Sequence, residues 1–269
     1  MKIALAFFGL PRSSGVAFPS IERNVLAPLR AAGDVRVFHH LWRQEHVFNP
    51  RTGEDQPVPR DIYLPFAGFE GVIEPRPEAP TRQLQRAMAY GDAFQDGFVA
   101  LRNLVLQLQS LYEVTQRVAA AQPDVVVFAR PDMLYHEAVR VEDVEQAMWE
   151  PDGVALPCWE SWGGFNDRFA ICGARAYKAY GGRMLLVDNF CERAQRPLHS
   201  ETFLRYALGF AGLSVRTIPL RASRVRVDGR VEAEDFEGVR SPLAVIPAKA
   251  GTQGSRLEDG SPGIPPSRE

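Results

Sequence analysis

An arginine and an aspartate directly follow one of the most apolar segments of the chain. Residues 124–128 are largely β-branched, which is typical of a strand buried on both faces, and Arg130-Pro131-Asp132 comes after them. A carboxylate at such a strand end can bind Mg²⁺ or Mn²⁺, which neutralises a diphosphate. Arg130 cannot bind a metal, but it can contact a phosphate through two N–H groups. A plain turn capped by Asp132 is the alternative.

A second group of polar residues follows the apolar N-terminal run, which we expect to form a strand over residues 3–9. Backbone amides and hydroxyls of this loop could bind phosphate, with Arg12 meeting its charge. A polar turn is the simpler alternative. A third interpretation comes from a resemblance to the phosphate loop of sulfotransferases. That loop has hydroxyl side chains at the two positions after the glycine, where this chain has Val16 and Ala17. The residues concerned are Pro11, Arg12, Ser13, Ser14 and Gly15.

Polar residues in three further segments could contact a ligand. Asn103, Gln107 and Ser110 share one face of a predicted helix, which could instead be its solvated face. Asp167 follows a loop rich in Gly and Trp, and it could bind sugar hydroxyls or satisfy a local turn. His199 could ligate a phosphate or a metal, and Glu201 could act as a base toward an acceptor. Both could equally belong to a helix cap.

The pattern of elements indicates an α/β fold. A strand over 3–9, a helix over 21–30 capped by Ser20 and a strand over 34–41 form a βαβ unit, whose strands should be parallel. Residues 43–80 are rich in Pro and charge and predict a long loop or lid. The remaining expected helices lie within 81–121 and over 141–149, 174–180, 184–193 and 201–211, and the remaining strands over 124–128, 153–157, 169–172, 213–219 and 225–227.

One domain over residues 1–240 is expected, followed by a disordered tail over 241–269, where Pro, Gly and Ser predominate. The net charge of −2 argues against nucleic acid as a partner. No segment has the length of a membrane span, and the short apolar start fits a strand better than a signal peptide. Three cysteines without zinc spacing suit a reducing compartment. We therefore expect a cytoplasmic protein, or one peripheral at the inner membrane.

The motifs, taken in order, resemble those of a bacterial and viral family of GT-A-like glycosyltransferases. The resemblance covers about residues 1 to 230 and preserves the order of the motifs. The matching segments are Phe8-Gly9-Leu10-Pro11-Arg12, Phe38-His39-His40-Leu41-Trp42, Asn103 with Ser110-Leu111, Arg130-Pro131-Asp132, Asn166-Asp167-Arg168-Phe169-Ala170, Tyr180-Gly181 and His199-Ser200-Glu201.

This resemblance implies a Rossmann-type three-layer sandwich of the GT-A kind, with a mostly parallel sheet and a small C-terminal β element. It also implies transfer of a sugar, a hexose or a related one, from a nucleoside-diphosphate donor to a glycan or polysaccharide acceptor. Asp132 would hold the metal, while Asp167 and Glu201 would face the sugar and the acceptor. The nucleotide pocket would be lined by Pro11, Arg12, Asn103 and Ser110, with Ser13 and Arg130 as further phosphate contacts.

Two other function classes stay open. A sulfotransferase would bind adenosine 3′,5′-bisphosphate in preference to UDP or GDP. A non-catalytic sugar- or partner-binding module on the same scaffold would tolerate the loss of the first aspartate of an Asp-x-Asp pair, a position that Arg130 occupies here.

Overall fold

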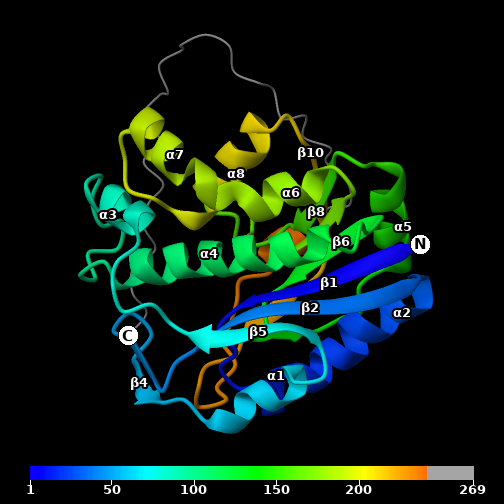
Figure 1. The fold of residues 1–269 in the computed structure, drawn as a ribbon, viewed down its shortest axis with the longest axis horizontal. Coiled ribbons are helices and arrows are strands. Elements are labelled where there is room, and N and C mark those ends of the chain that lie inside the picture. Colours follow the sequence, from blue (N-terminus) through cyan, green and yellow to red (C-terminus); the bar gives the residue numbers. More distant parts are fainter. Residues whose placement is uncertain (241–269) are drawn as a thin grey trace.

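A seven-stranded sheet forms the middle layer of the protein (Figure 1) in the computed structural model, which describes residues 1–240. Its strands are β1 (Lys2–Gly9), β2 (Asp34–Arg43), β5 (Glu70–Pro75), β6 (Val125–Ala129), β8 (Gly153–Pro157), β9 (Phe169–Gly173) and β10 (Ser214–Ile218). The order is β5-β2-β1-β6-β9-β8-β10, and every pair is parallel except the two that β9 forms. The expected α/β fold with a mostly parallel sheet is confirmed. The tail predicted to be disordered lies outside the described residues.

Two small antiparallel sheets flank the large one. One pairs β7 (Met133–Tyr135) with β11 (Ala222–Arg224), and the other pairs β3 (His46–Asn49) with β4 (Glu54–Pro57). The first of these joins β11, near the C-terminal end of the described chain, to β7 in its middle. The expected strand over 225–227 is wrong in its bounds, because β11 ends at Arg224 and Val225 forms only an isolated bridge with Val231.

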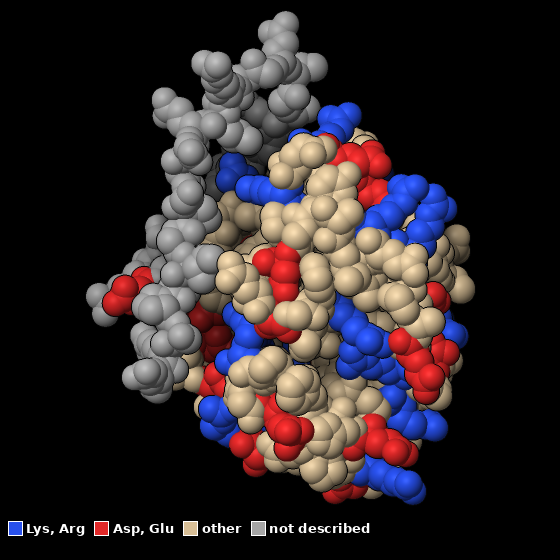
Figure 2. All heavy atoms as spheres, turned by 90° about the vertical axis from the view of Figure 1, so that its left-hand side faces the viewer, with Lys and Arg blue, Asp and Glu red and all other residues tan. Residues whose placement is uncertain are grey.

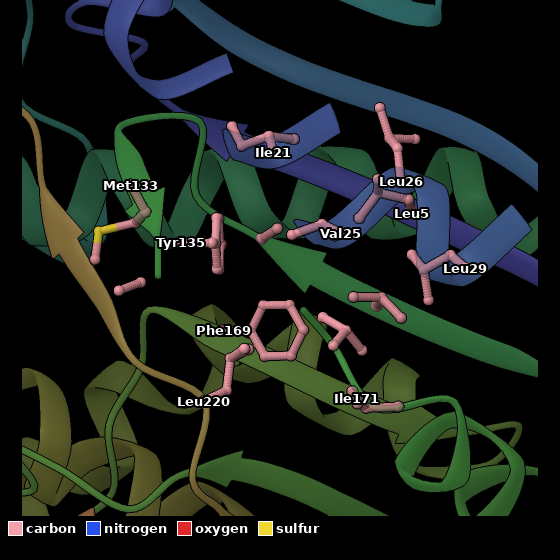
Figure 3. Close-up of a cluster of buried hydrophobic side chains, with 14 of the residues drawn as sticks. Leu5, Ile21, Val25, Leu26, Leu29, Met133, Tyr135, Phe169, Ile171 and Leu220 are labelled. Carbon is pink, nitrogen blue, oxygen red and sulfur yellow. The ribbon is translucent and has the colours of Figure 1, made fainter. Parts of the chain in front are cut away.

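One face of the sheet is covered by a continuous helical run and by α5 (Val141–Trp149). The run consists of α1 (Ser14–Ile21), the π-helical turn η1 (Glu22–Leu26) and α2 (Ala27–Ala32). Figure 3 shows how Ile21, Val25 and Leu29 from this run pack toward Leu5 of β1 and Phe169 of β9. All five side chains are buried, so this apolar layer fixes the helical run against the sheet.

The other face carries the remaining α-helices, of which α4 (Val99–Ala119) is the longest. Leu111, Val114 and Val118 of α4 pack on Phe128 and other sheet residues. This confirms the helical structure that the apolar spacing predicts between 81 and 121. The segment forms two helices, α3 (Arg82–Met88) and α4, which are separated by residues 89–98. Beside α4 lie α3 (Arg82–Met88), α6 (Ala176–Gly181), the short turn η3 (Gly182–Leu186), α7 (Val187–Ala194) and α8 (Ser200–Phe210).

The first helix starts earlier than predicted. Ser20 does not cap it, because its hydroxyl donates to the carbonyl of Ala17 at 2.7 Å and accepts from the backbone N–H of Tyr135 at 2.9 Å. The helix begins at Ser14 and contains Pro19, which has no N–H to donate to the preceding turn. The loop after β1 is therefore only about four residues long, from Leu10 to Ser13.

The prediction of a long loop over residues 43–80 is wrong. This stretch contains β3, β4, the 3₁₀ helix η2 (Arg60–Phe66) and β5, which pairs with β2 as an edge strand of the sheet. An edge strand tolerates proline because one of its sides needs no hydrogen bonds, so its composition resembles that of a loop. A further 3₁₀ turn, η4 (Glu237–Arg240), closes the described chain.

The three cysteines, Cys158, Cys172 and Cys191, are free. Within residues 1–240, none of the helices combines the length and apolar character needed to cross a bilayer.

Candidate functional site

The carboxyl ends of the parallel strands meet a cavity of about 750 Å³, a volume typical of small-molecule sites. Its walls come from the segments that follow β1, β2 and β6, from one face of α4, from the loop before β9, from the start of α8 and from β11. Figure 2 shows this side of the molecule, where basic side chains gather among acidic ones. Eight arginines line the cavity against three acidic residues, Asp92, Asp167 and Glu201.

Asp132 joins the loop after β1 to the end of β6. Arg130 donates from Nε to its Oδ1 at 2.9 Å and from Nη2 to its Oδ2 at 2.7 Å, and Arg12 donates from Nη1 to the same Oδ2. Burial acts to raise the pKa of Asp132, but the charges of Arg130 and Arg12 hold it well below its ordinary value. The loop after β1 and the end of β6 therefore meet at one edge of the sheet.

The Asp132 carboxylate does not reach the cavity. It is fully buried, and both of its oxygens accept hydrogen bonds from guanidinium groups, which also repel a metal cation. His199 has its Nδ1 3.2 Å from Oε2 of Glu201, without the geometry of a hydrogen bond. Over residues 1–240 no cluster of three or more His, Cys, Asp or Glu side chains is suited to a metal. As these side chains lie, Asp132 and His199 do not fit the Mg²⁺ or Mn²⁺ site expected from the sequence.

A chain of hydrogen bonds leads from Arg130 to the cavity wall. Arg130 donates from Nη1 to Gln107 of α4 at 2.7 Å, and Gln107 donates from Nε2 to Oδ2 of Asp167 at 2.8 Å. The hydroxyl of Ser200 donates to the same oxygen. Although burial acts to raise it, the pKa of Asp167 lies below its ordinary value because of Arg130 and Ser200. Asp167 is therefore ionised at neutral pH and held in a fixed position.

Glu201 also lines the cavity and is buried there. Its burial, together with the charge of Asp167, raises its pKa to about 8. The loop before β9 packs directly on its backbone, since Phe165 donates its N–H to the Glu201 carbonyl at 3.1 Å and a side chain at Gly164 would collide with that carbonyl. Asp167 and Glu201 thus form a pair of one ionised and one protonated carboxyl group, an arrangement that suits acid–base chemistry.

The other residues predicted for this site divide into two groups. Asn103 lines the cavity, whereas Pro11 is buried and neither it nor Ser13 reaches the wall. Ser14 directs its hydroxyl to the carbonyl of Ile62 at 2.5 Å. The loop after β1 therefore offers the cavity Arg12 but not its hydroxyls, which weakens the comparison with a sulfotransferase phosphate loop.

Ser110 was expected in a nucleotide pocket, but it is completely buried beneath the cavity. Its Oγ accepts from the N–H of Gly9 at 2.7 Å, donates to the carbonyl of His40 at 2.6 Å and lies 3.0 Å from Nδ1 of His40. His40 Nε2 in turn lies 3.0 Å from Glu74. This Ser-His-Glu series resembles a catalytic triad only in composition, because the hydroxyl is inaccessible. It fixes the ends of β1 and β2 to α4.

Replacing Ser110 by alanine should lower the free energy of unfolding by about 1–3 kcal/mol, because the buried N–H of Gly9 loses its acceptor. Urea unfolding at pH 7 measures this change. Ser214→Ala is the matched control, since Ser214 is exposed and should change the value by no more than about 0.5 kcal/mol. Equal unfolding midpoints for the two variants would contradict a role for Ser110 in holding the strand ends.

Several residues of the site escaped the sequence-based prediction, among them Arg168, Arg224 and Arg226. A signal existed for two of them: in the segment Arg224-Val225-Arg226 the arginines alternate with an apolar residue, which places both on one side of an extended chain. What the pattern could not show is that this side faces the cavity.

Residues from the loop after β1, from α4, from the loop before β9 and from the start of α8 thus meet at one cavity, although more than 180 positions separate Arg12 from Glu201 in the chain. No protein-family model matches the sequence, and no curated protein is detectably similar to it.

Proposed function

We propose that the protein is a glycosyltransferase that moves a sugar from a nucleoside-diphosphate sugar to a glycan or polysaccharide acceptor. The observation that carries this proposal is the composition of the cavity, in which eight arginines surround the two carboxyl groups of Asp167 and Glu201. Guanidinium groups are well matched to phosphate oxygens, and carboxyl groups to sugar hydroxyls. The position at the carboxyl edge of a mostly parallel sheet, where α/β proteins bind ligands, supports the same function.

In the proposed reaction a hydroxyl oxygen of the acceptor forms a bond to the anomeric carbon of the donor. The bond between this carbon and the diphosphate oxygen breaks, and its electron pair stays on the diphosphate. Arginines that are already in position favour this step, because they stabilise the negative charge as it develops. The fixed carboxylate of Asp167 accepts hydrogen bonds from sugar hydroxyls and so orients the donor.

The proton of the acceptor hydroxyl goes to Glu201 in this proposal. A base must be ionised, and the pKa of Glu201 is about 8 in the free protein. The rate should therefore rise as the pH increases toward about 8 and level off above it.

A panel of UDP-, GDP-, TDP- and CMP-linked sugars tests the function, each measured with EDTA and with Mn²⁺. Thermal shift reports binding, because a ligand that binds the folded state raises the Tm. Release of the nucleotide, with and without glycan acceptors, reports transfer. We expect one donor class to raise the Tm and to be turned over. Binding without turnover would favour the non-catalytic module, protection only by adenosine 3′,5′-bisphosphate would favour a sulfotransferase, and no nucleotide binding at all would refute the proposal.

A further inference from the structure

Five of the arginines that line the cavity form a cluster whose acidic partners lie behind it. Arg226 donates to Glu54 at 2.9 Å and to Glu232 at 2.7 Å, and Arg168 donates to Glu160 at 2.6 Å. None of these carboxylates lines the cavity, and neither does Asp132. The positive groups therefore face the cavity, while the negative groups orient them from the far side. The cluster consists of Arg12, Arg130, Arg168, Arg224 and Arg226.

Arg224 differs from the other four. Among the residues that the structure describes, its guanidinium has neither an ion pair nor a hydrogen bond, and its Nε is buried without a partner. Burial, together with the charges of Arg168 and Arg130, lowers the pKa of Arg224 to about 9. A partly buried cation that has no ion pair and lies beside other cations destabilises the folded protein. Glu234 partly offsets this charge, but it accepts from the backbone N–H of Arg224 at 3.1 Å and forms no ion pair with the guanidinium, so a ligand could supply the missing direct partner.

Neighbouring donors in the cluster are also unsatisfied. Within residues 1–240, Nε and Nη1 of Arg168 and Nε of Arg12 are buried without a hydrogen-bond partner. The nearest carboxylate oxygen to Arg12 Nε belongs to Glu54, at 3.5 Å. Buried donors of this kind are rare in native proteins, and they show that the cluster is incompletely paired beneath the cavity wall. The guanidinium groups that line the cavity suit an anion that has many acceptor oxygens and more than one negative charge.

We propose that this arginine cluster binds the diphosphate of the donor directly, with Arg224 as the principal contact, and neutralises its charge without Mg²⁺ or Mn²⁺. The identity of the occupant rests on the proposed function, whereas the anion site rests on the unsatisfied donors. The arrangement at Asp132 agrees with this inference, because its oxygens are already bound by Arg12 and Arg130. Added Mg²⁺ should compete with the protein for the diphosphate.

Calorimetric titration with inorganic pyrophosphate in EDTA at pH 7 tests the site. The wild-type protein should bind without metal, and excess Mg²⁺ should not tighten binding. Arg224→Gln should bind about 10- to 100-fold more weakly, as expected for the loss of charge-assisted hydrogen bonds. The control Arg36→Gln removes the same charge at an exposed position on β2 and should change the affinity by no more than about twofold. A requirement for Mg²⁺ or Mn²⁺, or unchanged binding by Arg224→Gln, would overturn the inference.

The Tm without ligand separates a binding role from a structural one. Arg224→Gln should raise this Tm, because it removes a partly buried, unpaired cation from beside other cations, whereas a structural arginine would give a lower Tm when replaced. A lower Tm would therefore count against the proposal. Arg224→Lys keeps the charge without the planar fork and should bind pyrophosphate with intermediate affinity.

Two outcomes distinguish this inference from the proposed function. Pyrophosphate binding in EDTA without turnover of any nucleotide sugar would reject the glycosyltransferase and keep the anion site. Turnover of a nucleotide sugar that EDTA abolishes would keep the glycosyltransferase and reject metal-free binding.

Discussion

Replacing Asp132 by alanine should destabilise the protein by about 3–5 kcal/mol, the range observed when one partner of a buried ion pair is removed. The change leaves Arg12 and Arg130 without their shared carboxylate, which is completely buried in the native protein. Asp132→Asn keeps the shape of the side chain and removes only its charge, so it should also lower the free energy of unfolding. This variant replaces Asp132→Ala in the experiment if the alanine protein does not fold. Urea unfolding at pH 7 measures both.

The control for this experiment is an exposed ion pair. Arg36 lies 2.7 Å from Glu70 at the edge of the sheet, and both side chains are more than half exposed. Glu70→Gln should therefore change the free energy of unfolding by no more than about 1 kcal/mol. If Asp132→Ala behaved like Glu70→Gln, Asp132 would not be the structural centre of the arginine cluster.

Acid should weaken the same contact. The pKa of Asp132 in the folded protein lies well below its ordinary value of 3.8. The ionised carboxylate therefore contributes its full stabilisation at a pH above the ordinary pKa, and this stabilisation is lost as the pH falls toward the lower pKa of the folded protein. Asp132→Asn should accordingly lose less stability than the wild type between pH 5 and the acid limit of folding, as measured by thermal unfolding across this range.

Replacing Glu201 by glutamine should lower kcat with the preferred donor by about 10²- to 10⁴-fold, the range typical of a lost acid–base group. The fold should persist at pH 7, because glutamine resembles the protonated carboxyl that the raised pKa of about 8 indicates there. The rise of the rate with pH should also disappear. Glu145→Gln, on the exposed surface of α5, is the control and should keep both the rate and its pH dependence.

Stability provides a second readout for Glu201 that needs no substrate. Its pKa rises from an ordinary 4.5 to about 8 on folding, so between these values the folded protein binds the proton more tightly than the unfolded chain does. This contribution to stability is present at low pH and is lost as the pH increases from about 4.5 to about 8. Glu201→Gln should flatten this part of the stability curve. An unchanged curve would place the pKa of Glu201 near its ordinary value and remove it as the base.

The parts of the fold that the sequence predicted correctly are those with strong local patterns. The β-branched run of β6 and the apolar spacing of α4 each reflect burial that recurs along one element, so neighbouring residues alone reveal it. The edge strand β5 and the early start of α1 were missed because proline in both mimics a loop. The pairing of β5 with β2 and the packing of α1 on the sheet, which are contacts between distant parts of the chain, determine the structure of these two segments.

The sequence predicted several residues of the candidate site correctly, but not how their side chains lie. Strand ends gave Arg12, Arg130 and Asp167, which do meet at one edge. The spacing of residues cannot tell which carboxylate faces a cavity and which one is enclosed by arginines, so Asp132 was expected to be accessible and is not. That distinction depends on side-chain contacts between residues more than a hundred positions apart.

The reversed direction of β9 determines how Asp167 arrives at the cavity. The parallel strands reach this edge with their last residues, whereas β9 leaves from it, and Asp167 lies two positions before its first residue. Pairing of Ala129 with Phe169 sets where that strand begins. A slip of one residue would shift Asp167 by about 3.3 Å and turn alternate side chains to the opposite face. The register between β6 and β9 thus sets the distance between Asp167 and the arginines of the cavity.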